Sequence, residues 1–133
     1  MNITRHPHFL RRLLLADAAS CLAIGAALAL GAGLVADQLG LPADLLRAAG
    51  LVLLPFAAFV LFVASRPILS RLGVWLIIGC NAVWVAGSAA LLIGGFAAPT
   101  ALGIVFVVAQ AFVVAVVAEL EAMGLRATSP IPA

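Results

Sequence analysis

Two acidic residues, Asp17 and Glu119, lie inside stretches of the chain that are otherwise strongly apolar. Asp17 follows Arg12 by five residues, about 7–8 Å along a helix, and Glu119 precedes Gly124 by the same interval. We therefore expect the two carboxylates at similar depth in a membrane. Two carboxylates in a medium of low dielectric constant can share one proton, because both cannot ionise cheaply. The pair is thus a candidate proton- or cation-binding site.

The same carboxylates also lie near arginines, which supports a structural interpretation. Arg12, Arg66 and Arg71 are the candidate ion-pair partners, and Glu121 either joins this network or faces water. Such a network fixes the helix ends without binding a proton. From the sequence we favour this structural interpretation and keep the proton site as the alternative.

Uncharged polar residues are expected deeper in the membrane. Asn81 and Gln110 fall at about the same depth on neighbouring helices, and Ser20 lies on the first helix. Amide side chains hydrogen-bond between helices in lipid, with about 0.6–2 kcal/mol per bond. We favour packing as their role over a substrate site. The candidate intramembrane polar residues are therefore Asp17, Ser20, Asn81, Gln110 and Glu119.

The composition requires a membrane to surround these groups. The chain has 133 residues, 66% of them hydrophobic and 9% charged, whereas soluble domains carry about 25% charged residues. A bilayer core needs about 20 apolar residues per helix. We predict a single all-α domain, an antiparallel up-down bundle of four transmembrane helices at about residues 10–36, 42–65, 68–94 and 100–123. A basic segment, 1–9, precedes the helices, and a tail, 124–133, follows them.

Proline and glycine mark the predicted helix ends. Pro42 and Pro67 are each suited to a first helical position, and Asp44 then lies in the first turn of its helix, where the helix dipole favours an anion. Gly124 suits the position just after the fourth helix. Short connections of this kind place consecutive helices side by side and antiparallel.

The arginines predict the orientation of the helices. All seven basic residues are arginine, and only Arg47 falls on the side opposite to the other six. Because cytoplasmic segments carry the excess of basic residues, both termini are expected in the cytoplasm. The absence of lysine, with abundant Ala, Leu, Gly and Val, indicates a GC-rich bacterial source. The predicted location is the bacterial inner membrane.

Motifs for enzymatic, metal or redox chemistry are absent from the sequence. Cys21 and Cys80 lie in apolar runs, no CxxC or Cys/His cluster occurs, and both histidines precede the first helix. Whether the two cysteines meet is not determined by their positions. The net charge of +2 is too small to indicate a nucleic-acid partner. We expect no enzyme activity, no cofactor and no metal.

One stretch of the chain carries a family resemblance. It includes Asn81-Ala-Val-Trp84, Ser88, Pro99-Thr100-Ala-Leu-Gly103, Gln110-Ala111 and Ala118-Glu119-Leu-Glu121-Ala-Met-Gly124-Leu-Arg126. These residues resemble small four-helix bacterial inner-membrane proteins of uncharacterised function. The resemblance implies a four-helix membrane fold and supplies no activity to transfer.

The sequence is consistent with two functions. The favoured one is a non-enzymatic structural or accessory membrane subunit, because the loops are short, small residues are frequent and catalytic groups are missing. The alternative is a small proton-coupled transporter or channel that uses Asp17 and Glu119. The expected partners are the lipid bilayer and either further copies of the chain or a larger membrane complex.

Overall fold

The computed structural model describes residues 8–95 and 98–127, which contain four helices and no strand. Each helix is long and apolar enough to cross a membrane. The prediction of an all-helical chain with four helices of membrane-spanning length and apolarity is confirmed. The outer parts of the two predicted terminal segments, 1–7 and 128–133, lie outside the described residues. The helices are α1 (Phe9–Leu39), α2 (Ala43–Ser65), α3 (Arg71–Ile93) and α4 (Ala101–Ala127).

The first two connections begin and end at residues with clear local roles. Gly40 ends α1 in the left-handed conformation, with φ of 68°, and its amide donates to the carbonyl of Ala36. Asp44 lies in the first turn of α2, as predicted, although Pro42 immediately precedes the helix instead of opening it. α3 begins at Arg71, later than predicted from Pro67. The reason is a cap, because the hydroxyl of Ser70 accepts a hydrogen bond from the Gly73 amide at 3.0 Å.

Helix α4 continues past Gly124 to Ala127, so this glycine does not end the helix as predicted. Gly124 is buried, and a Cβ atom there would lie 3.2 Å from a ring carbon of Phe9. Its function in the fold is therefore close contact between α4 and α1. The extra turn also places the acidic residues of α4 one turn further from the helix end than the sequence suggested.

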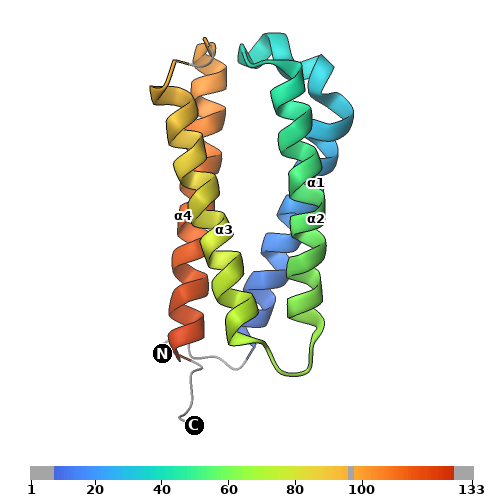
Figure 1. The fold of residues 1–133 in the computed structure, drawn as a ribbon, viewed down its shortest axis with the longest axis vertical. Coiled ribbons are helices and arrows are strands. Elements are labelled where there is room, and N and C mark those ends of the chain that lie inside the picture. Colours follow the sequence, from blue (N-terminus) through green and yellow to red (C-terminus); the bar gives the residue numbers. More distant parts are fainter. Residues whose placement is uncertain (1–7, 96–97, 128–133) are drawn as a thin grey trace.

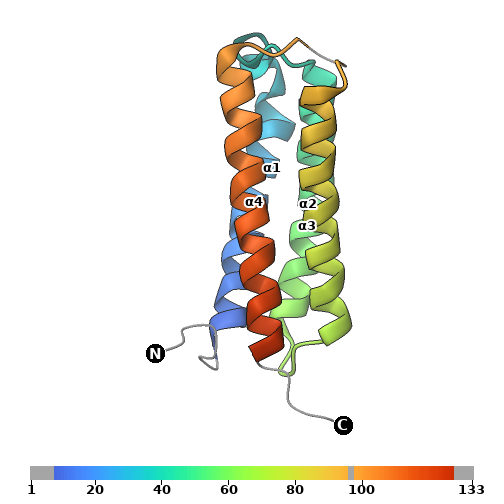
Figure 2. The same cartoon turned by 90° about the vertical axis from the view of Figure 1, so that its left-hand side faces the viewer.

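The four helices form two hairpins. α1 packs along α2 and α3 packs along α4, and we call these pairs the first and second hairpins. The hairpins meet mainly along α1 and α4, whereas α2 and α3 scarcely touch (Figures 1 and 2). We call the lower end in Figure 1 the base and the other the far end. The base carries Phe9, Ser65, Arg71 and Ala127, and the far end carries Leu39, Ala43, Ile93 and Ala101.

Glycines allow the closest approaches between helices. A Cβ atom on Gly50 of α2 would lie 2.6 Å from the carbonyl oxygen of Gly25 and 2.5 Å from the amide nitrogen of Ala29, both on α1. At the far end, a Cβ atom on Gly103 of α4 would collide with the carbonyl oxygen of Leu39. The backbones therefore touch directly at these points, as is typical of helices that pack in lipid.

The buried apolar residues separate into a base cluster and a far-end cluster. The base cluster draws on all four helices, whereas the buried members of the far-end cluster come from α1, α2, α4 and the α1–α2 connection. The base cluster is Leu10, Leu14, Ala18, Val60, Val63, Ala64, Val74, Ile77 and Leu125. The far-end cluster is Leu28, Ala32, Leu39, Leu41, Leu46 and Val107. The two hairpins are thus packed together most completely at the base.

Candidate functional site

Three polar side chains from three helices meet inside the protein, next to the base cluster. The Asn81 side-chain nitrogen on α3 donates to Oε1 of Glu121 on α4 at 3.0 Å, and to Oδ2 of Asp17 on α1 at 3.4 Å. One amide group therefore holds two carboxylates from different hairpins. We call these three residues the carboxylate cluster.

The carboxylate cluster is buried. Glu121 is fully buried, Asn81 is 5% exposed and Asp17 is 9% exposed. Glu121 Oε2 has no hydrogen-bond partner. A buried polar atom without a partner is costly in free energy, and a buried charge is more costly still. The cluster therefore offers an acceptor that a proton or another positively charged group can satisfy.

No arginine is paired with the carboxylate cluster within residues 8–95 and 98–127. The one salt bridge there joins Arg47 to Asp44 on α2, with 3.3 Å between nitrogen and oxygen. Arg11 instead donates to three backbone carbonyls at the end of α2, those of Ala64, Arg66 and Pro67. The ion-pair network that the sequence favoured is therefore not what holds these carboxylates.

The three arginines expected as ion-pair partners have other positions. Arg71 donates to the Leu125 carbonyl at 3.3 Å, which ties α3 to the end of α4. The Arg66 guanidinium lies over the Phe62 ring, 5.4 Å from its centroid. Arg12 is exposed at the start of α1. All three lie at the base, where lipid headgroups are expected.

Two of the predicted polar residues lie outside the carboxylate cluster. Glu119 is exposed. The interior position that we expected for Glu119 is occupied by Glu121. Ser20 is also exposed, and its hydroxyl donates to the carbonyl of Ala16 in its own helix at 2.9 Å. Asp17 and Asn81 are the predicted residues that the structure brings together.

Gln110 belongs to a second polar group, separate from the hydrogen bonds of Asn81. Its side-chain oxygen accepts from Trp84 Nε1 at 2.7 Å, and its nitrogen donates to the Ser88 hydroxyl at 3.0 Å. The Ser88 hydroxyl in turn donates to the Trp84 carbonyl at 2.8 Å. These bonds join α3 to α4, and the amide of Gln110 has a partner on both its atoms. This group is typical of interhelical packing in lipid.

The sequence does contain a signal for Glu121. It lies three residues before Gly124 and about five helical turns after Gly103, so it shares a helix face with both glycines. Both of these glycines make close contacts with α1. Glu119, two residues away, projects towards nearly the opposite face. Glycine spacing could therefore have identified Glu121 as the interior carboxylate.

The arrangement favours a proton over a metal ion. The Asn81 nitrogen lies within hydrogen-bonding distance of both carboxylates, and an amide N–H donor repels a metal cation. Among the described residues, no group of three or more His, Cys, Asp or Glu side chains is placed to hold a metal. Cys21 adds a weak thiol donor, with its sulfur 3.7 Å from Oδ1 of Asp17. Cys21 and Cys80 are both free thiols.

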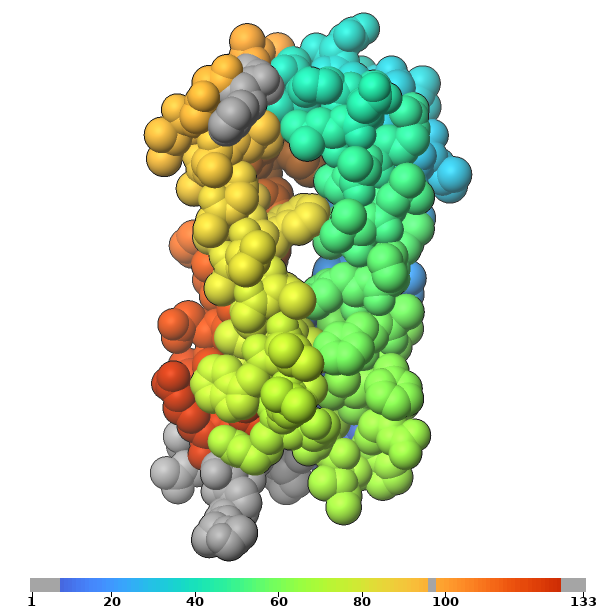
Figure 3. Space-filling model, viewed as in Figure 1, coloured from blue at the N-terminus to red at the C-terminus, as the bar shows by residue number. Residues whose placement is uncertain are grey.

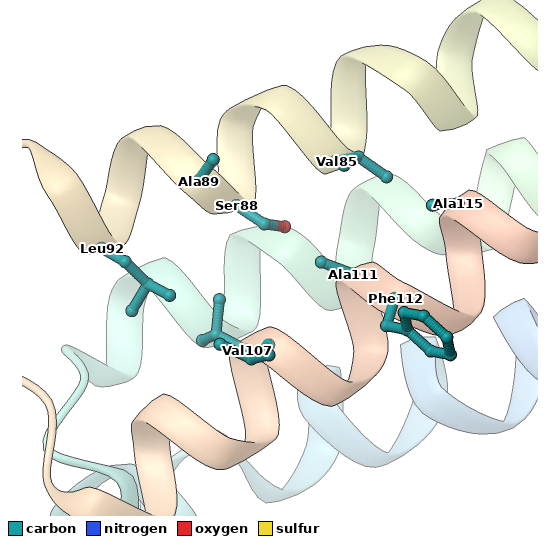
Figure 4. Close-up of a pocket in the computed structure, with 9 residues that line it drawn as sticks. Val85, Ser88, Ala89, Leu92, Val107, Ala111, Phe112 and Ala115 are labelled. Atoms are coloured by element: carbon teal, nitrogen blue, oxygen red, sulfur yellow. The ribbon is translucent and has the colours of Figure 1, made fainter.

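A shallow apolar groove lies between α3 and α4, away from the carboxylate cluster (Figure 4). Its volume is about 300 Å³. The Ser88 hydroxyl points into it, but the hydrogen bonds to Gln110 and to the Trp84 carbonyl occupy that group. The groove therefore offers apolar contact and no free polar group.

The described residues thus contain one polar cluster with an unmet hydrogen-bonding requirement, at Asp17, Asn81 and Glu121. The apolar groove and the Trp84–Gln110–Ser88 group have none. Comparison of the chain with protein-family models, with curated proteins and with solved structures finds no match.

Proposed function

We propose that this protein is a small proton-coupled membrane transporter or channel whose proton-binding site is the carboxylate cluster. The observation that carries the proposal is the pairing of Asp17 and Glu121 on the single amide of Asn81, with no ion pair to a basic side chain of residues 8–95 or 98–127. This geometry favours the alternative from the sequence over the ion-pair interpretation, with Glu121 in place of Glu119.

One proton removes both sources of instability in the carboxylate cluster, the repulsion between like charges and the unpaired Glu121 oxygen. It neutralises one of two like charges that are held on the same amide nitrogen in a medium of low dielectric constant. Bound to Glu121, it turns a buried acceptor without a partner into a hydrogen-bond donor. Loss of the proton restores both the repulsion and the unpaired atom. The cluster is therefore suited to exchange a proton in step with a change in helix packing.

An accessory membrane subunit is the second candidate, and the Trp84–Gln110–Ser88 group supports it. That group is complete in its hydrogen bonds and works as packing between α3 and α4. The large exposed apolar side chains, such as Leu30 at 88% and Leu34 at 80%, offer a surface for lipid, for another copy of the chain or for a larger complex. Native mass spectrometry from mild detergent measures such assembly directly.

Infrared difference spectroscopy tests the proton site. The purified protein in lipid nanodiscs is titrated over pH, and the carbonyl stretch of a protonated carboxylic acid is followed. We expect a titrating band in the wild-type protein and in Glu119→Gln, and its loss in Glu121→Gln. Glu119→Gln is the matched control, because it removes an exposed carboxylate from the same helix. If Glu121→Gln keeps the full wild-type band, the proton site is not the carboxylate cluster.

We further propose that the protein lies in the bacterial inner membrane with its base in the cytoplasm. The base carries four arginines, Arg11, Arg66, Arg71 and Arg126. Arg47 lies near the start of α2, at the far end. Cytoplasmic segments carry the excess of basic residues, so the base is assigned to the cytoplasm. Fusions to the C-terminus test this orientation. A cytoplasmic fluorescent reporter should be active there and a periplasmic phosphatase should be inactive. The reverse pattern would contradict it.

A further inference from the structure

The contact between α2 and α3 is closed near the base and open beyond it. The buried residues of α3 are Gly73, Val74, Ile77 and Asn81, and none lies between Asn81 and the end of the helix at Ile93. The space-filling view shows openings between α3 and α2 in the part of the molecule away from the base (Figure 3). We call the line of contact between α2 and α3 the seam. Asn81 is the last buried residue of α3, counted from the base.

Asn81 also links the two hairpins. Within the described part of the chain, the bond from Asn81 to Asp17 is the side-chain hydrogen bond that joins α3 to the first hairpin. α4 is attached to α1 more firmly. At the far end, the Thr100 amide donates to the Leu39 carbonyl at 3.0 Å, and the Thr100 hydroxyl donates to the Gln38 carbonyl at 2.6 Å.

The base also joins α1 to α4, through the contact of Gly124 with Phe9 and through Leu10 and Leu125 in the base cluster. α1 and α4 are thus held together at both the base and the far end. α2 and α3 are the free edges, with few contacts between them. Separation of the two hairpins is therefore easiest at the seam, and the Asp17–Asn81 bond is placed to oppose it.

We propose that the seam is a gate to the bilayer, and that the proton on the carboxylate cluster keeps it closed. This inference rests on the proposed proton site. With one proton shared, Asp17 and Glu121 are held together on Asn81. When the proton leaves, the two like charges repel each other and Asp17 separates from Asn81 with the first hairpin. The opening then extends from the far part of the seam to the carboxylate cluster, so the site communicates with lipid-soluble molecules.

Among the residues that the structure describes, few other titratable groups face the carboxylate cluster. α1 contributes Asp17 and the Cys21 thiol, and α4 contributes Glu121. α3 contributes the uncharged Asn81, and the buried residues of α2, which include Ala57 and Val60, are all uncharged and apolar. The basic side chains Arg11 and Arg71 are bonded to backbone carbonyls at the base. The pH response of the gate is therefore assigned to the two carboxylates.

Spin-label distance measurements in nanodiscs test the gate. One label replaces Val52 on α2 and the other replaces Val83 on α3, because both positions are well exposed. Cys21→Ala and Cys80→Ser remove the native thiols. We expect the distance between the labels to lengthen as the pH rises through the titration of the carboxyl band. A control pair at Val83 and Val113, within the second hairpin, should not change.

Variants separate the gate from a general effect of pH. Glu121→Gln keeps the side-chain shape and removes one charge, so its Val52–Val83 distance should stay short at every pH. Glu119→Gln should behave as the wild-type protein does. A wild-type distance that is independent of pH, or a distance in Glu121→Gln that lengthens as in the wild type, overturns the gate.

The two proposals fail in different ways. If the carboxyl band titrates and the seam distance is constant, the gate is wrong and the proton site stands. If no band titrates, both are wrong. A second measurement uses Trp84, which is half-buried on α3, in a Trp75→Phe background. Quenching of its fluorescence by lipids with brominated chains should increase with pH in the wild-type background, and should stay constant when Glu121→Gln is added.

Discussion

The side-chain nitrogen of Asn81 lies 3.0 Å from Oε1 of Glu121, and the same nitrogen lies 3.4 Å from Oδ2 of Asp17. This single amide therefore joins α3 to α4 and also joins the second hairpin to the first. Its position at the end of the closed seam makes it both a ligand of the carboxylates and a structural link.

Replacement of Asn81 by alanine should destabilise the protein. It leaves two buried carboxylates without their shared donor, which costs about 1–3 kcal/mol. Thermal unfolding in mild detergent, followed by circular dichroism, measures the effect. Ser20→Ala is the control and should change stability by less than about 0.5 kcal/mol, because Ser20 is exposed and bonds to its own helix. Equal losses in the two variants would contradict a special role for Asn81.

Gly50→Ala should weaken the first hairpin. The new Cβ atom would lie 2.5 Å from the Ala29 amide nitrogen, so α1 and α2 must move apart, at a cost of about 1–3 kcal/mol. Gly87→Ala is the matched control, because a Cβ atom there meets nothing within 4 Å. That control should be neutral or stabilise the helix by up to about 1 kcal/mol. The same sign of effect in both variants would show that packing against α1 is not the cause.

Gln110→Leu should destabilise the contact between α3 and α4 through Trp84. The indole N–H loses its acceptor, at a cost of about 1–3 kcal/mol. A double-mutant cycle with Trp84→Phe isolates this bond, because the phenylalanine has no N–H to leave unpaired. We expect Gln110→Leu to cost less in the Trp84→Phe background. An unchanged cost there would mean that the bonds to Ser88 and Val107 dominate.

Arg11→Ala should destabilise the base, whereas Arg12→Ala should not. Arg11 donates to three carbonyls where α2 ends, and hydrogen bonds from a charged donor contribute about 1.5–3 kcal/mol each. Its neighbour Arg12 is exposed on the same turn. Because both changes remove one positive charge from the same end, the comparison controls for orientation in the membrane. Chemical unfolding of both variants in detergent micelles measures the difference.

Helix number and approximate limits could be predicted from the sequence, because each span needs a long apolar run and each connection carries proline or glycine. The errors lie at helix ends. Ser70 caps α3 three residues after the proline expected to open it, and Gly124 is a contact glycine inside α4. A glycine in the sequence looks the same whether it ends a helix or allows a neighbour to approach. The choice depends on the position of Phe9, which is distant in the chain.

The carboxylate cluster was predicted in part. Asp17 and Asn81 were singled out as polar residues in apolar runs, but Glu119 was paired with Asp17 instead of Glu121. In a soluble helix, a polar face and an apolar face reveal which side is buried. In α4 nearly every residue is apolar, so that contrast is absent, and only the spacing of Glu121 from Gly103 and Gly124 distinguishes it from Glu119.

The sequence by itself determined that Asp17 and a carboxylate of the fourth helix are retained within apolar segments, because membrane-spanning runs and their polar exceptions are properties of composition. Only the tertiary structure decided that Glu121 is buried beside Asp17, that Asn81 joins the two, and that no arginine among the described residues forms an ion pair with either carboxylate. These outcomes depend on the rotation of each helix about its axis, and close glycine contacts between backbones set that rotation.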